Sequence, residues 1–85
     1  MTALLKPGAP AGEINAAIRA VEARRPYTPT DDALASLLSL IVHRHRHVPE
    51  TEEWVAMCTC GEEWVCPELV AAMTLAAAIR EGARS

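Results

Sequence analysis

Apolar residues recur at helical spacing in the first half of the chain and predict two amphipathic helices. The first helix is expected over residues 13–25, ending before Pro26, and the second is expected over residues 31–45. Thr30 is placed to cap the second helix, and the two aspartates after it bring negative charge to the first turn, where the helix dipole favours it. The two apolar stripes are Ile14, Ala17, Ile18 and Val21, then Leu34, Leu37, Leu38 and Ile41.

A third helix is predicted by the stretch LVAAMTLAAAI, which runs from Leu69 to Ile79 and is apolar on almost every side. Pro67 suits the first helical position, because its missing N–H has no partner there, and Gly82 suits the end of the helix. A helix with so little polar surface is normally buried on more than one face. We therefore expect it to lie at the centre of a bundle or to bind a partner, either as a homodimer or in a complex with another protein.

The segment between the second and third helices predicts a short β-hairpin. Residues 53–58 form the first expected strand, Gly61 allows a tight turn, and residues 63–65 form the returning strand. This pairing is expected to bring Trp54 close to Trp64 on one side of the hairpin. The predicted fold class is therefore mainly α, with about three helices and a short hairpin before the last one.

Length and composition limit what these elements can form. The 85 residues suffice for one domain, with residues 1–12 as a flexible lead-in and residues 13–85 as the folded unit. No apolar run reaches the roughly 18 residues that a membrane span needs, and the first ten residues lack the apolar core of a signal peptide. We expect a cytoplasmic protein without membrane contact, whose thin core needs a metal ion, a disulfide or a partner for stability.

Three cysteines, Cys58, Cys60 and Cys66, fall within nine residues. An odd number of cysteines without a secretion signal fits metal binding in a reducing compartment better than a disulfide framework. Cys58 and Cys60 flank a turn before Gly61, as the ligands of a zinc knuckle do, and Cys66 precedes a helix whose dipole favours a thiolate. Since a structural zinc site takes four ligands, these cysteines leave one position to be filled.

The fourth ligand is expected from the histidines at the end of the second helix. His45 continues the apolar stripe of that helix and should face the interior, so it is the expected partner in a Cys₃His zinc site. His47 is the alternative because it lies closer to the cysteines along the chain, whereas His43 should be exposed. Without a metal, these histidines would still be favourable near the negative end of the helix dipole. A zinc-knuckle hairpin followed by a helix would make the fold treble-clef-like.

The cysteine motif resembles that of short zinc-finger-like orphan proteins of actinobacteria and their phages, in which a histidine precedes the pattern Cys-x-x-Cys-Gly-x-x-Trp-Pro-Cys-Pro. The first cysteine of this chain stands one place late, at Cys58, and Val65 replaces a proline. The resemblance covers residues 43–67 and implies a metal site but no activity. The matching positions are Cys60, Gly61, Trp64, Cys66 and Pro67.

A closed four-ligand site favours a non-enzymatic, zinc-stabilised module for protein–protein interaction, such as a regulator or adaptor of an actinobacterium or phage, because no coordination position is left for a substrate. A nucleic-acid-binding regulator is the alternative, with Arg44 and Arg46 as phosphate contacts, although the net charge of −3 disfavours it. An iron–sulfur or redox sensor is a further alternative, because three cysteines and a histidine can also hold a cluster.

Overall fold

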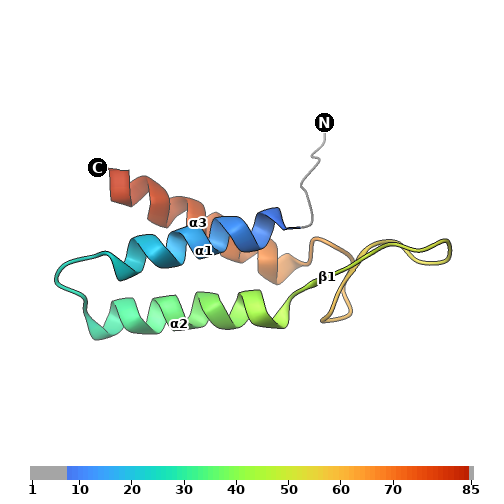
Figure 1. Ribbon diagram of the computed structural model, residues 1–85, viewed down its shortest axis with the longest axis horizontal. Coiled ribbons are helices and arrows are strands. Elements are labelled where there is room, and N and C mark those ends of the chain that lie inside the picture. The colour runs from blue at the N-terminus through green and yellow to red at the C-terminus, as the bar shows by residue number, and fades with distance from the viewer. Residues whose placement is uncertain (1–7, 85) are drawn as a thin grey trace.

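The computed structural model describes residues 8–84, which form three helices and one β-hairpin (Figure 1). The fold class is as predicted: mainly α, with a small antiparallel hairpin before the last helix. The elements in chain order are α1 (Ala9–Glu22), α2 (Pro29–Arg44), β1 (His47–Val48), β2 (Met57–Cys58) and α3 (Pro67–Arg84).

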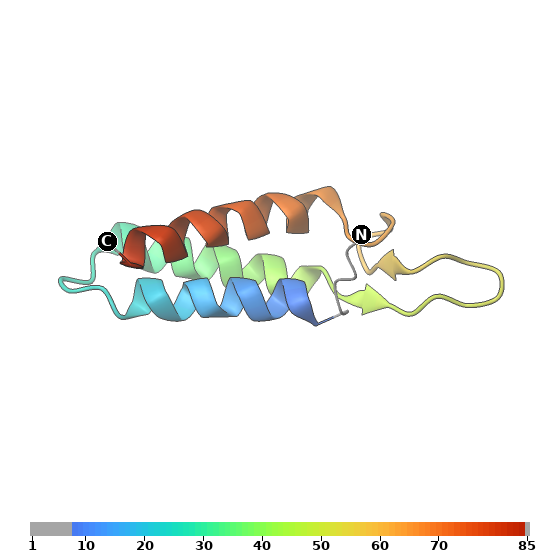
Figure 2. The ribbon, with the colours of Figure 1, turned by 90° about the horizontal axis from the view of Figure 1, so that it is seen from above.

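The helices lie along the length of an elongated molecule, which measures 50 × 26 × 15 Å (Figures 1 and 2). α2 runs antiparallel to α1 and α3, so the end of α2 and the starts of α1 and α3 meet at the same end of the bundle. The hairpin leaves the bundle at that end and extends away from it. α3 packs mainly on α1 and contacts α2 less.

The core consists of residues at helical spacing on the facing sides of the helices. Many of them are alanines, so the helices approach closely and the core is thin. Two cysteines, Cys58 and Cys66, lie at the hairpin end of this core and are about as buried as its leucines, Leu38 and Leu69. The buried helix positions are Ile14, Ala17 and Val21 of α1, Ala35 and Leu38 of α2, and Leu69, Ala72, Ala76 and Ile79 of α3.

The first helix begins at Ala9, four residues before the predicted start, and ends at Glu22. Pro10 lies in its first turn, where the missing N–H costs no hydrogen bond, and its ring is buried. The predicted flexible lead-in is therefore wrong for residues 9–12, and residues 1–7 lie outside the described part of the chain.

The second helix is capped by Thr28, two residues earlier than predicted. The Thr28 hydroxyl accepts a hydrogen bond from the Asp31 N–H at 3.1 Å, and the Asp31 carboxylate accepts one from the Thr28 N–H at 3.0 Å. This reciprocal pair is a capping box, and Pro29 occupies the first helical position after it. Arg24 adds an ion pair with Asp31 at 3.0 Å, which ties the end of α1 to the start of α2.

The hairpin is built from other residues than predicted. β1 pairs with β2 in the register His47 with Cys58 and Val48 with Met57, and residues 49–56 form the loop between them. Of the predicted pairing between residues 53–58 and 63–65, only a single bridge of Met57 with Glu63 is present in residues 8–84.

The two tryptophans consequently occupy different places. Trp54 lies in the loop of the hairpin with 68% of its surface exposed. Trp64 packs edge-on against His47, with ring centroids 5.0 Å apart and an interplanar angle of 77°. The expected pairing of Trp54 with Trp64 is replaced by this contact, because the returning strand pairs with the segment that follows α2.

The third helix starts at Pro67, as predicted, and continues through Gly82 to Arg84. Only one of its faces packs on the bundle, so Ile79 is buried while Val70 and Leu75 are exposed. The expected central position is therefore wrong, and binding of a partner by this helix stays a prediction. Within residues 8–84, no helix has the length and hydropathy that crossing a bilayer requires.

Candidate metal centre

Four side chains converge where the hairpin joins the bundle: His45, Cys58, Cys60 and Cys66. The ring nitrogens and sulfurs that these residues offer as ligands all lie within 4.8 Å of one another. They come from three separate segments, namely the end of α2, the turn that follows β2, and the residue before α3. The structure thus brings together the four residues that the sequence predicted as ligands.

His45 is placed by the end of α2. The helix stops at Arg44, and His45 is its C-cap with extended backbone angles (φ −120°, ψ 95°), while its N–H still donates to the Ile41 carbonyl at 3.1 Å. The imidazole is 8% exposed, and its Nδ1 lies 3.3 Å from the Sγ atoms of both Cys58 and Cys66. His45 therefore faces inward, although its direction is set by an extended cap rather than by a last helical turn.

The alternative ligand, His47, does not join the group among residues 8–84. His47 lies two residues after His45, at the start of β1, and its ring packs edge-on against Trp64. His43 is exposed on the last turn of α2, as expected.

The turn that carries Cys58 and Cys60 is held by its own backbone. The Cys58 N–H donates to the Glu62 carbonyl at 2.8 Å, and the Gly61 N–H donates to the Cys58 carbonyl at 2.9 Å. Gly61 has φ +99°, a conformation that residues with a side chain rarely adopt, so glycine is required at this position. Cys58 is buried beneath the turn and Cys60 is exposed at its outer side.

Thr59, which the sequence analysis did not single out, fastens this turn to the end of α2. Its hydroxyl donates to the Arg44 carbonyl at 2.8 Å and accepts from the Arg46 N–H at 3.0 Å, and its own N–H donates to the Arg46 carbonyl at 2.9 Å. Arg44 and Arg46 flank His45 in the chain. The three hydrogen bonds of Thr59 therefore hold His45 next to the turn that carries Cys58 and Cys60.

Cys66 lies at the start of α3, where unpaired backbone N–H groups point towards it. Its carbonyl accepts from the Val70 N–H at 3.1 Å, and its sulfur accepts from the Leu69 N–H. Burial nevertheless raises the pKa of Cys66 to about 11, and the neighbouring Cys58 adds to this increase.

The pKa of Cys58 is lowered, in contrast to that of Cys66. Burial opposes its ionisation, but hydrogen bonds from the Cys60 N–H and from the Cys60 and Cys66 thiols outweigh this effect and lower its pKa. Ionisation of one sulfur thus makes ionisation of the next one harder. A cation among the three sulfurs removes this conflict, because a bound metal ion deprotonates the thiols that coordinate it.

The spacing of the donor atoms fits a single tetrahedral ion. Zinc–sulfur bonds of about 2.3 Å and zinc–nitrogen bonds of about 2.0 Å place neighbouring ligand atoms about 3.5–3.8 Å apart. The two observed nitrogen–sulfur distances of 3.3 Å lie close to this range. Three thiolates and one imidazole form a donor set typical of structural zinc.

The second ring nitrogen of His45, Nε2, also has a partner. Nε2 contacts the Glu68 carboxylate, which lies in the first turn of α3. Histidines that bind a metal through one ring nitrogen commonly donate the other N–H to a carboxylate, which fixes the tautomer and the ring orientation. Glu68 has no sequence signal that connects it with the site, because only the fold brings α3 to the end of α2.

Comparisons with known proteins do not extend this description: no protein-family model, curated protein or solved structure matches the chain. The likeness to actinobacterial and phage zinc-finger-like proteins therefore stays a prediction from the cysteine motif.

Proposed function

We propose that this chain is a small, non-enzymatic, zinc-stabilised module that acts by binding another protein. In this proposal one zinc ion is held by Cys58, Cys60, Cys66 and His45. The observation that carries the proposal is the convergence of these four donor atoms, three from cysteines close together in sequence and one from His45, which lies 13 residues before Cys58.

Zinc is favoured over an iron–sulfur cluster by the closeness of the ligands. Donor atoms within 4.8 Å of one another leave room for one ion, whereas a cluster places several iron and sulfide atoms between its cysteine ligands. A structural role is favoured over a catalytic one because three cysteines and a histidine complete a tetrahedral site.

The role of the ion follows from the elements that it joins. His45 ends α2, Cys58 ends β2, and Cys66 precedes α3. An ion bound to all of them fixes the hairpin relative to the bundle, where the protein itself supplies strands of only two residues each. Protein binding is supported by the apolar residues exposed on the hairpin loop and on α3. A regulatory or adaptor role would follow from such binding.

Metal analysis tests the proposal directly. We expect one zinc per chain in protein purified without added metal, and a colourless solution, since an iron–sulfur cluster would absorb visible light. Replacement by Co²⁺ should give the intense visible and near-ultraviolet bands of tetrahedral cobalt bound to three thiolates and one imidazole.

A chelation melt measures what the ion contributes. The melting temperature should fall on treatment with a strong chelator and recover on addition of zinc. Metal-free protein with an unchanged melting temperature would contradict the proposal. A brown protein that contains iron and sulfide would show that the site holds an iron–sulfur cluster instead of zinc.

A further inference from the structure

The hairpin loop, residues 49–56, presents the most exposed large apolar residue that the structure describes. Trp54 is 68% exposed and its neighbour Val55 is 56% exposed. The loop lies at the far end of the extension that leaves the bundle, away from the helices (Figures 1 and 2). Burial of so large an apolar side chain against a partner is favourable, and tryptophan is among the residues that most often dominate protein interfaces.

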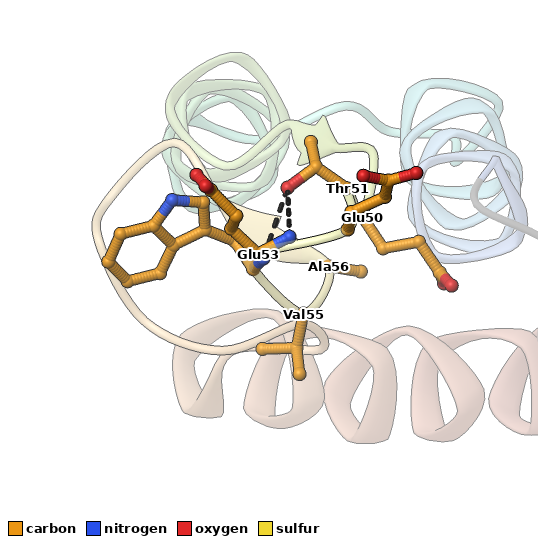
Figure 3. Close-up of a pocket in the computed structure, with 7 residues that line it drawn as sticks. Glu50, Thr51, Glu53, Val55 and Ala56 are labelled. Carbon is orange, nitrogen blue, oxygen red and sulfur yellow. Dashed lines mark hydrogen bonds between the residues drawn. The ribbon is translucent and has the colours of Figure 1, made fainter.

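The loop is shaped by its own hydrogen bonds. The Thr51 hydroxyl accepts from the N–H groups of Glu53 at 3.2 Å and Trp54 at 3.0 Å (Figure 3). The Thr51 N–H donates to the Trp54 carbonyl at 2.8 Å. The backbone around Trp54 is thereby held in one turn without support from the core. A turn that is already formed loses less conformational entropy on binding than a free loop.

The charge around Trp54 is of one sign. Glu50, Glu52 and Glu53 are all exposed, and with Trp54, Val55 and their neighbours they line a hollow of about 260 Å³ (Figure 3). Carboxylates at the rim of an apolar contact favour a partner with positive charge and repel nucleic acid and anionic lipid. The exposed apolar residues of α3, Val70 and Leu75, have no such ring of charge around them in the sequence.

The candidate metal site and the loop are joined by the two strands. β2 ends at Cys58, and β1 begins two residues after His45. A metal ion on these two ligands therefore fixes both strands that carry the loop. This step rests on the proposed function, in which zinc positions an interaction surface.

We propose that the loop of residues 49–56 is the docking surface of this protein, with Trp54 as its anchor. Its partner is a protein segment that combines an apolar side chain or pocket with lysines or arginines beside it. Trp54 supplies the apolar contact, and the three glutamates select the positive charge.

Selection from a library of random linear peptides tests this surface without a known partner. The zinc-loaded chain is the target, and Trp54→Ser protein is used to remove peptides that bind elsewhere. Peptides rich in both aromatic or aliphatic residues and lysine or arginine should be enriched. We expect them to bind the parent chain at least roughly tenfold more tightly than the Trp54→Ser variant.

Two further variants separate the surfaces. Glu52→Gln with Glu53→Gln should weaken binding and reduce its dependence on salt. Leu75→Ser is the matched control, because it removes an exposed apolar residue from α3, and it should bind the selected peptides as the parent does. Three results would overturn the inference. The first is that no peptide binds the parent chain in preference to the Trp54→Ser variant, and the second is that the selected peptides are acidic. The third is that only Leu75→Ser abolishes binding.

Zinc content is measured on the same protein samples. A chain with one zinc that fails the peptide selection would overturn the docking surface and leave the zinc module intact. A chain that binds no zinc would overturn the proposed function whatever the peptides do.

Discussion

The helical bundle and the hairpin end of this molecule are held together in different ways. The bundle buries apolar side chains from its helices and has a capping box at the start of α2. The hairpin end contributes two sulfurs and few apolar side chains to the core, and its strands have two residues each. Hydrophobic burial can therefore stabilise the bundle, whereas the hairpin end depends on hydrogen bonds and, in the proposed function, on a bound zinc ion.

The largest effect is expected from loss of the metal site. Cys66→Ser removes a ligand and the link between the hairpin and α3, and structural zinc sites in small domains contribute on the order of 10 kcal/mol of apparent folding free energy. Tryptophan fluorescence should change and the melting temperature should fall, with zinc content below one per chain. A Cys66→Ser variant as stable as the parent would show that the hairpin end does not depend on the metal site for its stability.

Two histidine substitutions near the end of α2 test the metal site further. His45→Ala removes the only nitrogen ligand of the group and should weaken zinc binding more than a hundredfold, since loss of a hydrogen-bond partner of a ligand alone costs about 10–100-fold. His43→Ala is the matched control, because His43 lies two residues earlier and is exposed. Competition with a chromophoric chelator measures both affinities. Equal affinities would exclude His45 as a ligand.

The bundle should respond to a core substitution even when zinc is bound. Leu38 is fully buried on α2, and Leu38→Ala should lower the free energy of unfolding by about 2–5 kcal/mol through lost burial and a cavity. Leu37→Ala, on the exposed side of the same helix, is the control and should cost little. Urea unfolding followed by circular dichroism measures both. Zinc affinity of folded Leu38→Ala protein should equal that of the parent.

A smaller effect is expected from the carboxylate behind His45. Glu68→Gln keeps the size of the side chain but removes the charge that orients the imidazole, so zinc affinity should fall about 10–100-fold. Glu63→Gln changes an exposed glutamate near the same turn and should leave the affinity unchanged. Both proteins should retain one zinc at saturation, since all four ligands remain. Identical affinities for the two variants would remove Glu68 from the site.

The smallest effect concerns the cap of α2. Thr28→Ala should cost about 1 kcal/mol at neutral pH by removing one half of the capping box. Hydrogen bonds from Thr28 and the ion pair with Arg24 lower the pKa of Asp31, against the effect of burial. A carboxyl with a lowered pKa stabilises the fold above its unfolded pKa of about 3.8 and loses that contribution as the pH falls through the folded value.

The difference between the parent and Thr28→Ala should therefore shrink in acid. Unfolding at several pH values below 5 measures it. A difference that stays constant down to the lowest pH would show that the hydrogen bond from the Thr28 hydroxyl to the Asp31 carboxylate contributes no stability.

Sequence periodicity was a good guide to the helices and a poor guide to the hairpin. The predicted stripes of α1 and α2 include residues that the structure buries, such as Ile14, Val21 and Leu38, but the second stripe also includes Leu37, which is 54% exposed. The strands are too short to show an alternating pattern, and the pairing of Met57 and Cys58 with the segment after α2 depends on the hydrogen bonds of Thr59. These partners are 13 or more residues apart, so no local pattern reports them.

The sequence by itself determined the helical class and indicated the three cysteines and a nearby histidine as candidate ligands, because helical periodicity and the chemistry of cysteine and histidine are local properties. Only the tertiary structure decided between His45 and His47, placed Glu68 behind the imidazole, and left Trp54 exposed at the end of the hairpin. Each of these depends on which distant backbone segments pair, and that pairing is set by hydrogen bonds and packing across the whole chain.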